Sequence, residues 1–320
     1  MSDSHDLPSP AFLAIAERGI GDALTLLPSL RALRAAHPDW RIELLTPSLF
    51  PLAENLRDVA TVLDHRPLAG TSTDERLAWL RERNLDWVWN TEGERGPWTA
   101  AIESLESRRW VNAPAQREWG SRQVLQVRYE QLRELFPELT APGGTALSLT
   151  PAQQAASRSF RAQYPRDSTL VAIQPGAGDP NRVWPAEKFR ALAWALAKRP
   201  RVTVLLFLAD GQPFFSESAG APAPPNLHCV SDPLDVVVSK IAACDLCIGN
   251  DSGFYHLAFA LGSKVVGIYR SLRSARRWAY RSPRSRAVIC WMPRQLRGDW
   301  TEWVSVRRVL AAARRHAPGL

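Results

Sequence analysis

The sequence has few cysteines and no long apolar run. Four cysteines among 320 residues are too few for a disulfide framework, so we expect a protein that works in a reducing cytoplasm. The apolar stretch 202–209 has eight residues, far fewer than the ~18 that a membrane-spanning helix needs. The first ten residues are polar and acidic, which predicts no secretion signal. Membrane-embedded and secreted classes of protein are therefore not expected.

Lysine is missing from residues 1–150, and acidic residues are scarce in the remainder. Residues 1–150 carry 16 arginines and 21 acidic residues, a balance of −5, whereas residues 151–320 carry 24 basic and 11 acidic residues, a balance of +13. The segment 270–286 has seven arginines and no acidic residue. A basic half indicates anionic partners, among them nucleotide phosphates and an anionic membrane surface, although a solvated arginine-rich surface would look the same. No nucleic-acid-binding module accompanies the charge, so we expect no nucleic-acid partner.

Short apolar runs rich in β-branched residues alternate with helical patterns along the whole chain. The expected strands are 11–16, 41–46, 59–63, 86–90, 169–174, 201–208, 227–230, 246–249 and 264–269, and the expected helices are 23–36, 123–135, 186–198, 234–243 and 253–261. Such alternation predicts an α/β protein with parallel sheets and helices on both faces. The segment 138–151, rich in Pro, Gly and Thr, is the best linker candidate. We therefore expect two Rossmann-like domains, 1–145 and 146–320, facing a ligand-binding cleft.

A glycine-rich turn, Gly19-Ile20-Gly21-Asp22, follows the first expected strand. Gly21 at a strand-to-helix turn lets the backbone approach a ligand, and the start of the next helix favours negative charge. A dinucleotide site would need a third glycine where Leu24 stands, so this is a poor NAD fingerprint. Asp22 is either a helix N-cap or a carboxylate that acts as a general base.

A second glycine-rich loop follows the strand 169–174. It includes Gly176 and Gly178, and leads through Arg182 to Pro185, which opens the next helix. A loop of this kind can cradle phosphate, and Arg182 can add a charged bidentate contact. An ordinary surface turn is an equally good interpretation of these residues alone.

The third and most specific motif is a strand, a tight polar turn and a helix at 246–261. Amides at Ser252 and Gly253 near the helix start can hold a diphosphate, and Asp251 can accept hydrogen bonds from sugar hydroxyls. His256 lies about one turn further, on the side expected to face such a ligand. The alternative is that Asp251 or Ser252 merely caps the helix while His256 packs in the interior.

Two other features favour packing over chemistry. Cys244 and Cys247 form a CxxC pair with no second metal-ligand pair, so we expect buried thiols and no metal site. Trp87 and Trp89 share one face of a strand and could contact a sugar or lipid, but core packing is the better interpretation.

Taken together, the stretches 21–38, 175–189 and 250–269 resemble glycosyltransferase family nine, the ADP-heptose:lipopolysaccharide heptosyltransferases. The resemblance implies a GT-B fold in which the N-terminal domain holds the acceptor and the C-terminal domain holds the nucleotide-sugar. It also implies an inverting enzyme that needs no metal and no other cofactor. By the same resemblance, Asp22 is the base, and Arg182, where the family usually has lysine, binds diphosphate. Asp251, Ser252, Gly253 and His256 then hold the sugar and its phosphates.

The function expected from the resemblance is transfer of a heptose-like sugar from ADP-heptose to a hydroxyl of the lipopolysaccharide core. Gly21 and Gly176 join the substrate-binding residues as close-approach glycines, and Arg270 and Arg273 join them as charges that stabilise the departing diphosphate. A lipid-linked acceptor would bring the cytoplasmic enzyme into peripheral contact with the anionic inner face of the membrane. The alternatives are a different sugar, a protein acceptor, and a homologue that binds nucleotide-sugar without catalysis.

Overall fold

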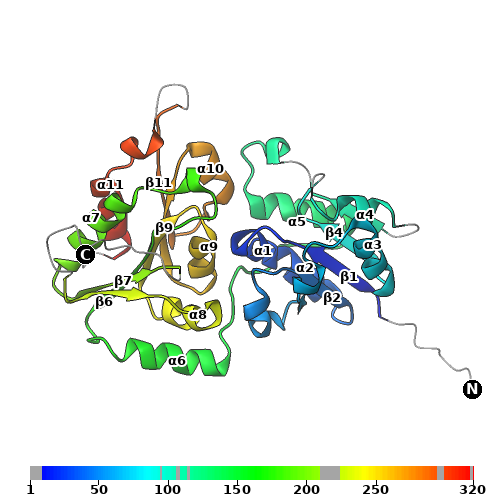
Figure 1. The fold of residues 1–320 in the computed structure, drawn as a ribbon, viewed down its shortest axis with the longest axis horizontal. Helices are drawn as coiled ribbons and strands as arrows, with labels where there is room; N and C mark the ends of the chain where they lie inside the picture. Colours follow the sequence, from blue (N-terminus) through cyan, green and yellow to red (C-terminus); the bar gives the residue numbers. More distant parts are fainter. Residues whose placement is uncertain are drawn as a thin grey trace, which may run out of the picture. The chain divides into compact units, whose positions relative to one another are not determined.

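The computed structural model describes residues 9–93, 96–105, 109–113, 116–209, 224–293, 299–317 and 320. The first eight residues, over which the sequence predicts no secretion signal, lie outside this described part. The chain divides into two compact units, Met1–Thr145 and Ala146–Leu320. Each unit is built around one parallel sheet (Figure 1).

The N-terminal unit, blue to cyan in Figure 1, has a five-stranded sheet in the order β3-β2-β1-β4-β5. Its strands are β1 (Ala11–Ile15), β2 (Arg41–Leu45), β3 (Thr61–Leu63), β4 (Trp87–Asn90) and β5 (Arg109–Asn112). Its helices are α1 (Ile20–Leu24), α2 (Leu27–Ala36), α3 (Thr73–Glu82), α4 (Thr99–Glu103) and α5 (Val124–Leu135), with 3₁₀ turns η1 (Phe50–Leu56), η2 (Arg66–Leu68) and η3 (Gln116–Trp119). Every residue of β1 is buried, as expected for a central parallel strand that helices cover on both faces.

The C-terminal unit, green to red in Figure 1, has a six-stranded parallel sheet in the order β11-β10-β9-β6-β7-β8. Its strands are β6 (Thr169–Gln174), β7 (Val202–Phe207), β8 (Leu227–Val230), β9 (Leu246–Asn250), β10 (Lys264–Tyr269) and β11 (Ser285–Ile289). Its helices are α6 (Pro151–Arg161), α7 (Ala186–Ala197), α8 (Leu234–Ala242), α9 (Gly253–Ala260), α10 (Leu272–Trp278) and α11 (Val306–His316), with 3₁₀ turns η4 (Pro180–Arg182) and η6 (Trp300–Trp303). Helices α7 and α11 cover one face of this sheet, and α8, α9 and α10 lie over the other.

The predicted α/β class and parallel sheets are confirmed, and the nine expected strands lie within two residues of observed ones. The expected helix 23–36 is wrong in one respect, because it is split into α1 and α2. Pro28 has no N–H to donate to the carbonyl of Leu24, so the helical ladder breaks there. Thr25 marks the break, since its hydroxyl donates to the carbonyl of Asp22 at 2.7 Å.

Strand order reverses once in each sheet, and the reversal positions the candidate site. In the N-terminal sheet it falls between β1 and β4, and in the C-terminal sheet between β6 and β9. The loops that follow two such strands run in opposite directions, leaving a crevice at their carboxyl ends where α/β proteins bind ligands. The turn with Asp22 follows β1, and the loops with Arg182 and Asp251 follow β6 and β9. All three sequence motifs therefore follow strands that border a reversal point.

Candidate active site

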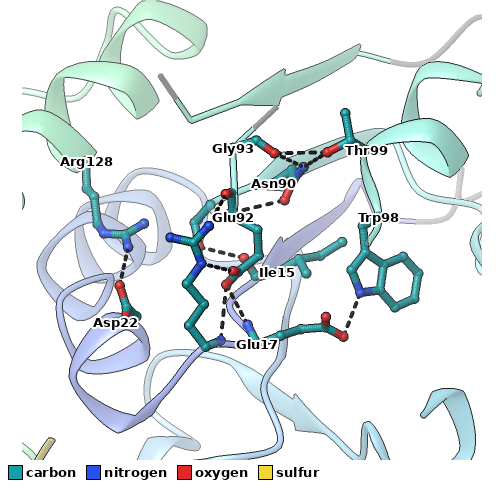
Figure 2. Close-up of polar contacts among 11 residues, drawn as sticks. Ile15, Glu17, Asp22, Asn90, Glu92, Gly93, Trp98, Thr99 and Arg128 are labelled. Atoms are coloured by element: carbon teal, nitrogen blue, oxygen red, sulfur yellow. Dashed lines mark hydrogen bonds and ion pairs between the residues drawn. The ribbon is translucent and has the colours of Figure 1, made fainter. Parts of the chain in front are cut away.

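The turn between β1 and α1 is held in place by a buried carboxylate from the neighbouring strand. Glu92, just after β4, accepts hydrogen bonds from the backbone N–H groups of Glu17 at 2.8 Å and Arg18 at 3.3 Å (Figure 2). Its other oxygen pairs with Nε of Arg18 at 2.7 Å. Burial raises the pKa of Glu92, while Arg18 and the two backbone donors oppose that rise. Glu92 thus fixes the backbone that leads into α1.

The same turn is anchored on its other side by Trp98. The indole N–H of Trp98 donates to the carboxylate of Glu17 at 2.7 Å. Behind it, the side-chain amide of Asn90 bonds to Asn112 at 2.7 Å and to Thr99 at 3.3 Å. These contacts come from two strands and one helix, so the turn that carries Asp22 is supported from several directions.

Asp22 lies in the first turn of α1, with its side chain 25% exposed. The N-cap is Gly19, so the alternative in which Asp22 caps the helix is wrong. Oδ1 of Asp22 lies 3.5 Å from Nη2 of Arg128, whose side chain is only 2% exposed. Burial lowers the pKa of Arg128, and the negative charges of Asp22 and Glu92 oppose this effect. Asp22 is therefore an accessible carboxylate that a buried guanidinium holds on one side (Figure 2).

Arg128 is a residue that the sequence motifs do not reveal. It lies on α5, 106 residues after Asp22. Its Nε and Nη1 atoms are buried and have no hydrogen-bond partner among the described residues. A buried cation with so few bonds depends strongly on nearby negative charge, which Asp22 supplies. The only sequence signal is an arginine on the apolar face of a helix.

In the C-terminal unit, Asn250 ties together the loops that follow β6 and β9. Its side-chain oxygen accepts the backbone N–H of Trp184 at 3.0 Å, and its nitrogen donates to the carbonyls of Pro175 at 2.8 Å and Gly176 at 3.2 Å. Asn250 is fully buried. Three bonds from one side chain therefore fix both ends of the glycine-rich loop against β9.

Gly176 is also held by the side chain that precedes the loop. With its amide oriented to satisfy both groups, Gln174 donates to the carbonyl of Gly176 at 2.8 Å and accepts its N–H at 3.2 Å. A Cβ at position 176 would lie 2.7 Å from the Gln174 amide, so glycine leaves room for this contact. The group that approaches Gly176 closely is therefore the Gln174 side chain of the protein itself.

Arg182 and Asp251 are brought together as the sequence motifs suggest. Nη1 of Arg182 donates to the backbone carbonyl of Asp251 at 3.3 Å, and Nε lies 3.4 Å from the carboxylate of Asp179. The hydrogen bonds of Asn181 lower the pKa of Asp179, and the charges of Arg182 and Arg270 add to this. Arg182, in η4, and Arg270, directly after β10, thus lie near the same carboxylate.

Asp251 is buried, and its Oδ2 accepts a hydrogen bond from the hydroxyl of Ser274 on α10 at 2.6 Å. Ser252 is the N-cap of α9, but its buried hydroxyl makes no cap bond and has no partner among the described residues. Gly253 is the first residue of that helix. The α9 start therefore presents backbone donors and an unused hydroxyl, a combination suited to an anionic oxygen.

His256 is buried, as the packing alternative predicts, and its Nδ1 lies 2.9 Å from the hydroxyl of Tyr280. Burial lowers the pKa of His256 to about 3, and the charge of Arg182 adds to the effect. The ring is therefore neutral near pH 7. Its closeness to Arg182 places it beside the loop that follows β6.

The arginines of segment 270–286 do not form one charged surface. Arg273 is exposed and Arg270 half-buried, whereas Arg277 is buried. Arg284 donates to the carbonyls of Phe259 at 3.1 Å and Ser263 at 3.4 Å. Arg277 is therefore not part of the exposed charge that segment 270–286 offers to an anionic ligand.

The features expected to pack do so. Cys244 and Cys247 are buried, and burial raises the pKa of both thiols. Trp89 is fully buried, and Trp87 packs against Phe136 with ring centroids 4.7 Å apart. Within the described residues, no three or more histidine, cysteine, aspartate or glutamate side chains are grouped so that they could hold a metal ion. None of the helices in the described ranges combines the length and apolar character that a membrane span requires.

Comparison with known proteins identifies the family. Residues 112–296, more than half of the chain, match the family model described as glycosyltransferase family 9 (heptosyltransferase). The chain belongs to glycosyltransferase family 9. No curated protein matched the sequence.

Three solved structures show the same two-domain GT-B fold as this family 9 glycosyltransferase. A family 9 glycosyltransferase from Veillonella parvula has a TM-score of 0.77 and 16% identity, over 98% of this chain and 99% of that one. ADP-heptose lipopolysaccharide heptosyltransferase II from E. coli has a TM-score of 0.68 and 18% identity, over 96% and 98%. The E. coli heptosyltransferase WaaC with ADP has a TM-score of 0.63 and 14% identity, over 97% and 98%.

Proposed function

We propose that this glycosyltransferase is an inverting heptosyltransferase that uses ADP-heptose and a hydroxyl of the lipopolysaccharide core. The observation that supports the proposal is that a carboxylate follows a strand at the order reversal of one sheet, and anion-binding groups follow strands at the order reversal of the other. The N-terminal unit has an accessible carboxylate, Asp22, after β1. The C-terminal unit has the α9 start together with Arg182 after β9 and β6. Structures of WaaC with ADP and with ADP-2-deoxy-2-fluoro heptose support the choice of donor.

In the proposed reaction, Asp22 removes the proton from the acceptor hydroxyl as its oxygen attacks the anomeric carbon. The new carbon–oxygen bond forms on the face opposite the diphosphate, so the configuration inverts. The bond between the anomeric carbon and the diphosphate oxygen breaks, and its electron pair leaves with the nucleoside diphosphate. The proton stays on Asp22 and is then lost to solvent.

Groups of the C-terminal unit are proposed to stabilise the negative charge that develops on the leaving diphosphate. Arg182 is held by the carbonyl of Asp251, so its guanidinium is fixed before substrate binds. The amides at Ser252 and Gly253 add positive potential from the start of α9. Arg270, directly after β10, and Arg273, in the first turn of α10, contribute further positive charge. Such preorganised donors can do the electrostatic work that a metal ion does in other transferases.

Arg128 is proposed to orient the base. It holds one carboxylate oxygen of Asp22 at 3.5 Å, which leaves the other oxygen available for the acceptor proton. At an effective dielectric constant of about 20, a unit charge pair at this distance attracts by about 5 kcal/mol before desolvation is counted. That attraction is large enough to restrict the rotamer of Asp22.

The test is release of nucleoside diphosphate from a panel of ADP-, UDP- and GDP-sugars, with and without lipopolysaccharide-core acceptors. We expect acceptor-dependent turnover with ADP-heptose that persists in EDTA. Asp22→Asn should lose roughly 10²–10⁴-fold in kcat. Because it also removes the charge beside the buried Arg128, its folding is checked by circular dichroism before its activity is compared. Turnover with another sugar or a protein acceptor would replace the named substrates. Nucleotide binding without turnover, or an Asp22→Asn variant that keeps most of its activity, would contradict the proposed mechanism.

A further inference from the structure

The hydroxyl of Tyr280 is directed at one ring nitrogen of His256. Both side chains are buried, and the oxygen lies 2.9 Å from Nδ1. The Tyr280 ring stacks on Phe259 with centroids 3.8 Å apart and ring planes 9° from parallel. Its backbone N–H donates to the hydroxyl of Tyr255 at 3.2 Å. Tyr280 is therefore fixed by two neighbours that are independent of its bond to His256.

Counting hydrogen-bond donors decides which atom carries the shared proton. A neutral imidazole has one N–H, and a tyrosine hydroxyl has one O–H. Among the described residues, Nδ1 of His256 is the one partner of the Tyr280 hydroxyl. If Nδ1 carried the hydrogen, the buried tyrosine O–H would have no acceptor, which costs roughly 1–3 kcal/mol. When Tyr280 donates to Nδ1, both of these buried atoms are satisfied and the hydrogen of the imidazole is on Nε2. Nε2 of His256 is not one of the fully buried atoms without a partner, so an N–H there can meet solvent or a ligand.

We infer that Tyr280 holds His256 in its Nε2–H form, and that this N–H donates a hydrogen bond to an oxygen of the bound nucleotide-sugar. The inference rests on the proposed function, because it names the donor substrate as the acceptor of that bond. Within the described part of the chain, no group bonds to Nε2 of His256. His256 lies one turn after Ser252, at the end of α9 assigned to the diphosphate. Tyr280 is thus a positioning residue that acts through His256.

The electrostatics of the site agree with a neutral donor. Burial and the charge of Arg182 hold the pKa of His256 at about 3, so the ring stays uncharged over the physiological range. A bare Nε2 would repel a phosphoryl or sugar oxygen lone pair, whereas Nε2–H attracts it. The hydrogen bond that Tyr280 makes to Nδ1 therefore determines whether a ligand meets a bare Nε2 or an Nε2–H. In functional histidines, the partner of one ring nitrogen commonly sets the protonation of the other.

The tautomer can be read directly from protein labelled with ¹⁵N in its histidine rings. We expect the wild-type His256 spectrum to show a proton on Nε2 and none on Nδ1, and Tyr280→Phe to show a mixture of the two forms. Tyr269→Phe is the matched control, because it removes from the same aromatic cluster a buried hydroxyl that has no partner among the described residues. Its spectrum should keep the wild-type form.

Binding of ADP, UDP and GDP, measured by calorimetry, tests the second half of the inference. Tyr280→Phe should weaken the best of these ligands by on the order of fivefold, as loss of one well-oriented hydrogen bond would. Tyr269→Phe should bind as wild type. In the double variant with His256→Gln, the Tyr280 substitution should have no further effect, because its action depends on the imidazole.

The outcomes separate this inference from the proposed function. A wild-type proton on Nδ1, or equal weakening in both tyrosine variants, would overturn the role of Tyr280 while leaving the glycosyltransferase proposal intact. If no nucleoside diphosphate binds the wild type, the donor role of His256 and the proposed function both fail, and the spectrum still decides the tautomer. An effect of Tyr280→Phe that persists in the His256→Gln background would mean that Tyr280 acts on packing alone.

Discussion

Acidification should destabilise the folded protein through His256. Burial holds the folded-state pKa of this ring at about 3, whereas an unfolded histidine titrates near ~6.5. Below pH 6.5 the unfolded chain therefore binds a proton that the folded chain does not. The sign follows from linkage: this contribution to stability is complete above the unfolded pKa and is lost as the pH falls from about 6.5 towards 3. At pH 5, which is about 1.5 pH units below the unfolded-state pKa, the free energy of unfolding should be about 2 kcal/mol lower than at neutral pH.

The assay is urea denaturation followed by tryptophan fluorescence at pH 7.5 and pH 5. The comparison is between wild type and His256→Gln, whose amide can still bond to Tyr280 but does not titrate. Wild type should lose about 2 kcal/mol more than the variant between the two pH values. Phe259→Leu, a change on the same helix that adds no titrating group, should lower the stability by the same amount at both pH values.

The result that would refute this reasoning is a parallel loss in wild type and His256→Gln. It would mean that the ring takes up a proton in the folded state, and therefore that the surroundings of the ring are more polar or more open than the structure shows. A larger loss in the variant than in wild type would be equally damaging, because it reverses the sign.

Three further predictions follow from the contacts of the candidate site residues in each unit. Asn250→Ala leaves the buried N–H of Trp184 unpaired, so the free energy of unfolding should fall by about 1–3 kcal/mol and the donor KM should rise in steady-state kinetics. Arg128→Met should lower kcat about tenfold or more with little change in donor KM, and Arg128→Lys should recover part of the loss; a KM-only effect would exclude a role in orienting the base. Charge reversal at Arg273 should raise the donor KM more than reversal at Arg314, by a margin that shrinks as salt rises; equal effects would show that both are ordinary surface charges.

Much of the fold is visible in the sequence because each central strand is a buried apolar run. Strands β1, β6 and β9 are bordered by glycine-rich or polar turns, and these turns carry the motifs. The strands β5 and β11 are missed because arginine, serine and asparagine in Arg109–Asn112 and Ser285–Ile289 obscure the apolar pattern. Both lie at sheet edges, where fewer residues need to be apolar.

The candidate site is less visible, because its supporting residues come from distant parts of the chain. Glu92 meets the β1–α1 turn across 75 residues, and Asn250 meets Trp184 across 66. Arg128 reaches Asp22 from a helix more than a hundred residues away. A motif shows where a loop begins, but only packing determines which buried side chain closes it. The residues to which we assign the chemistry thus lie in sequence motifs, whereas those that hold them in position do not.

The tie that Asn250 makes between two loops has a consequence for the rate and selectivity of the nucleotide binding that we propose. A loop already fixed at Pro175, Gly176 and Trp184 has little backbone freedom left to lose when a ligand arrives. Association then needs no slow ordering step and can approach the rate set by diffusion and charge. The same rigidity limits adaptation, since a ligand of a different shape would have to break buried bonds to fit. A preformed cradle of this kind favours fast exchange of one nucleotide class over tolerance of many.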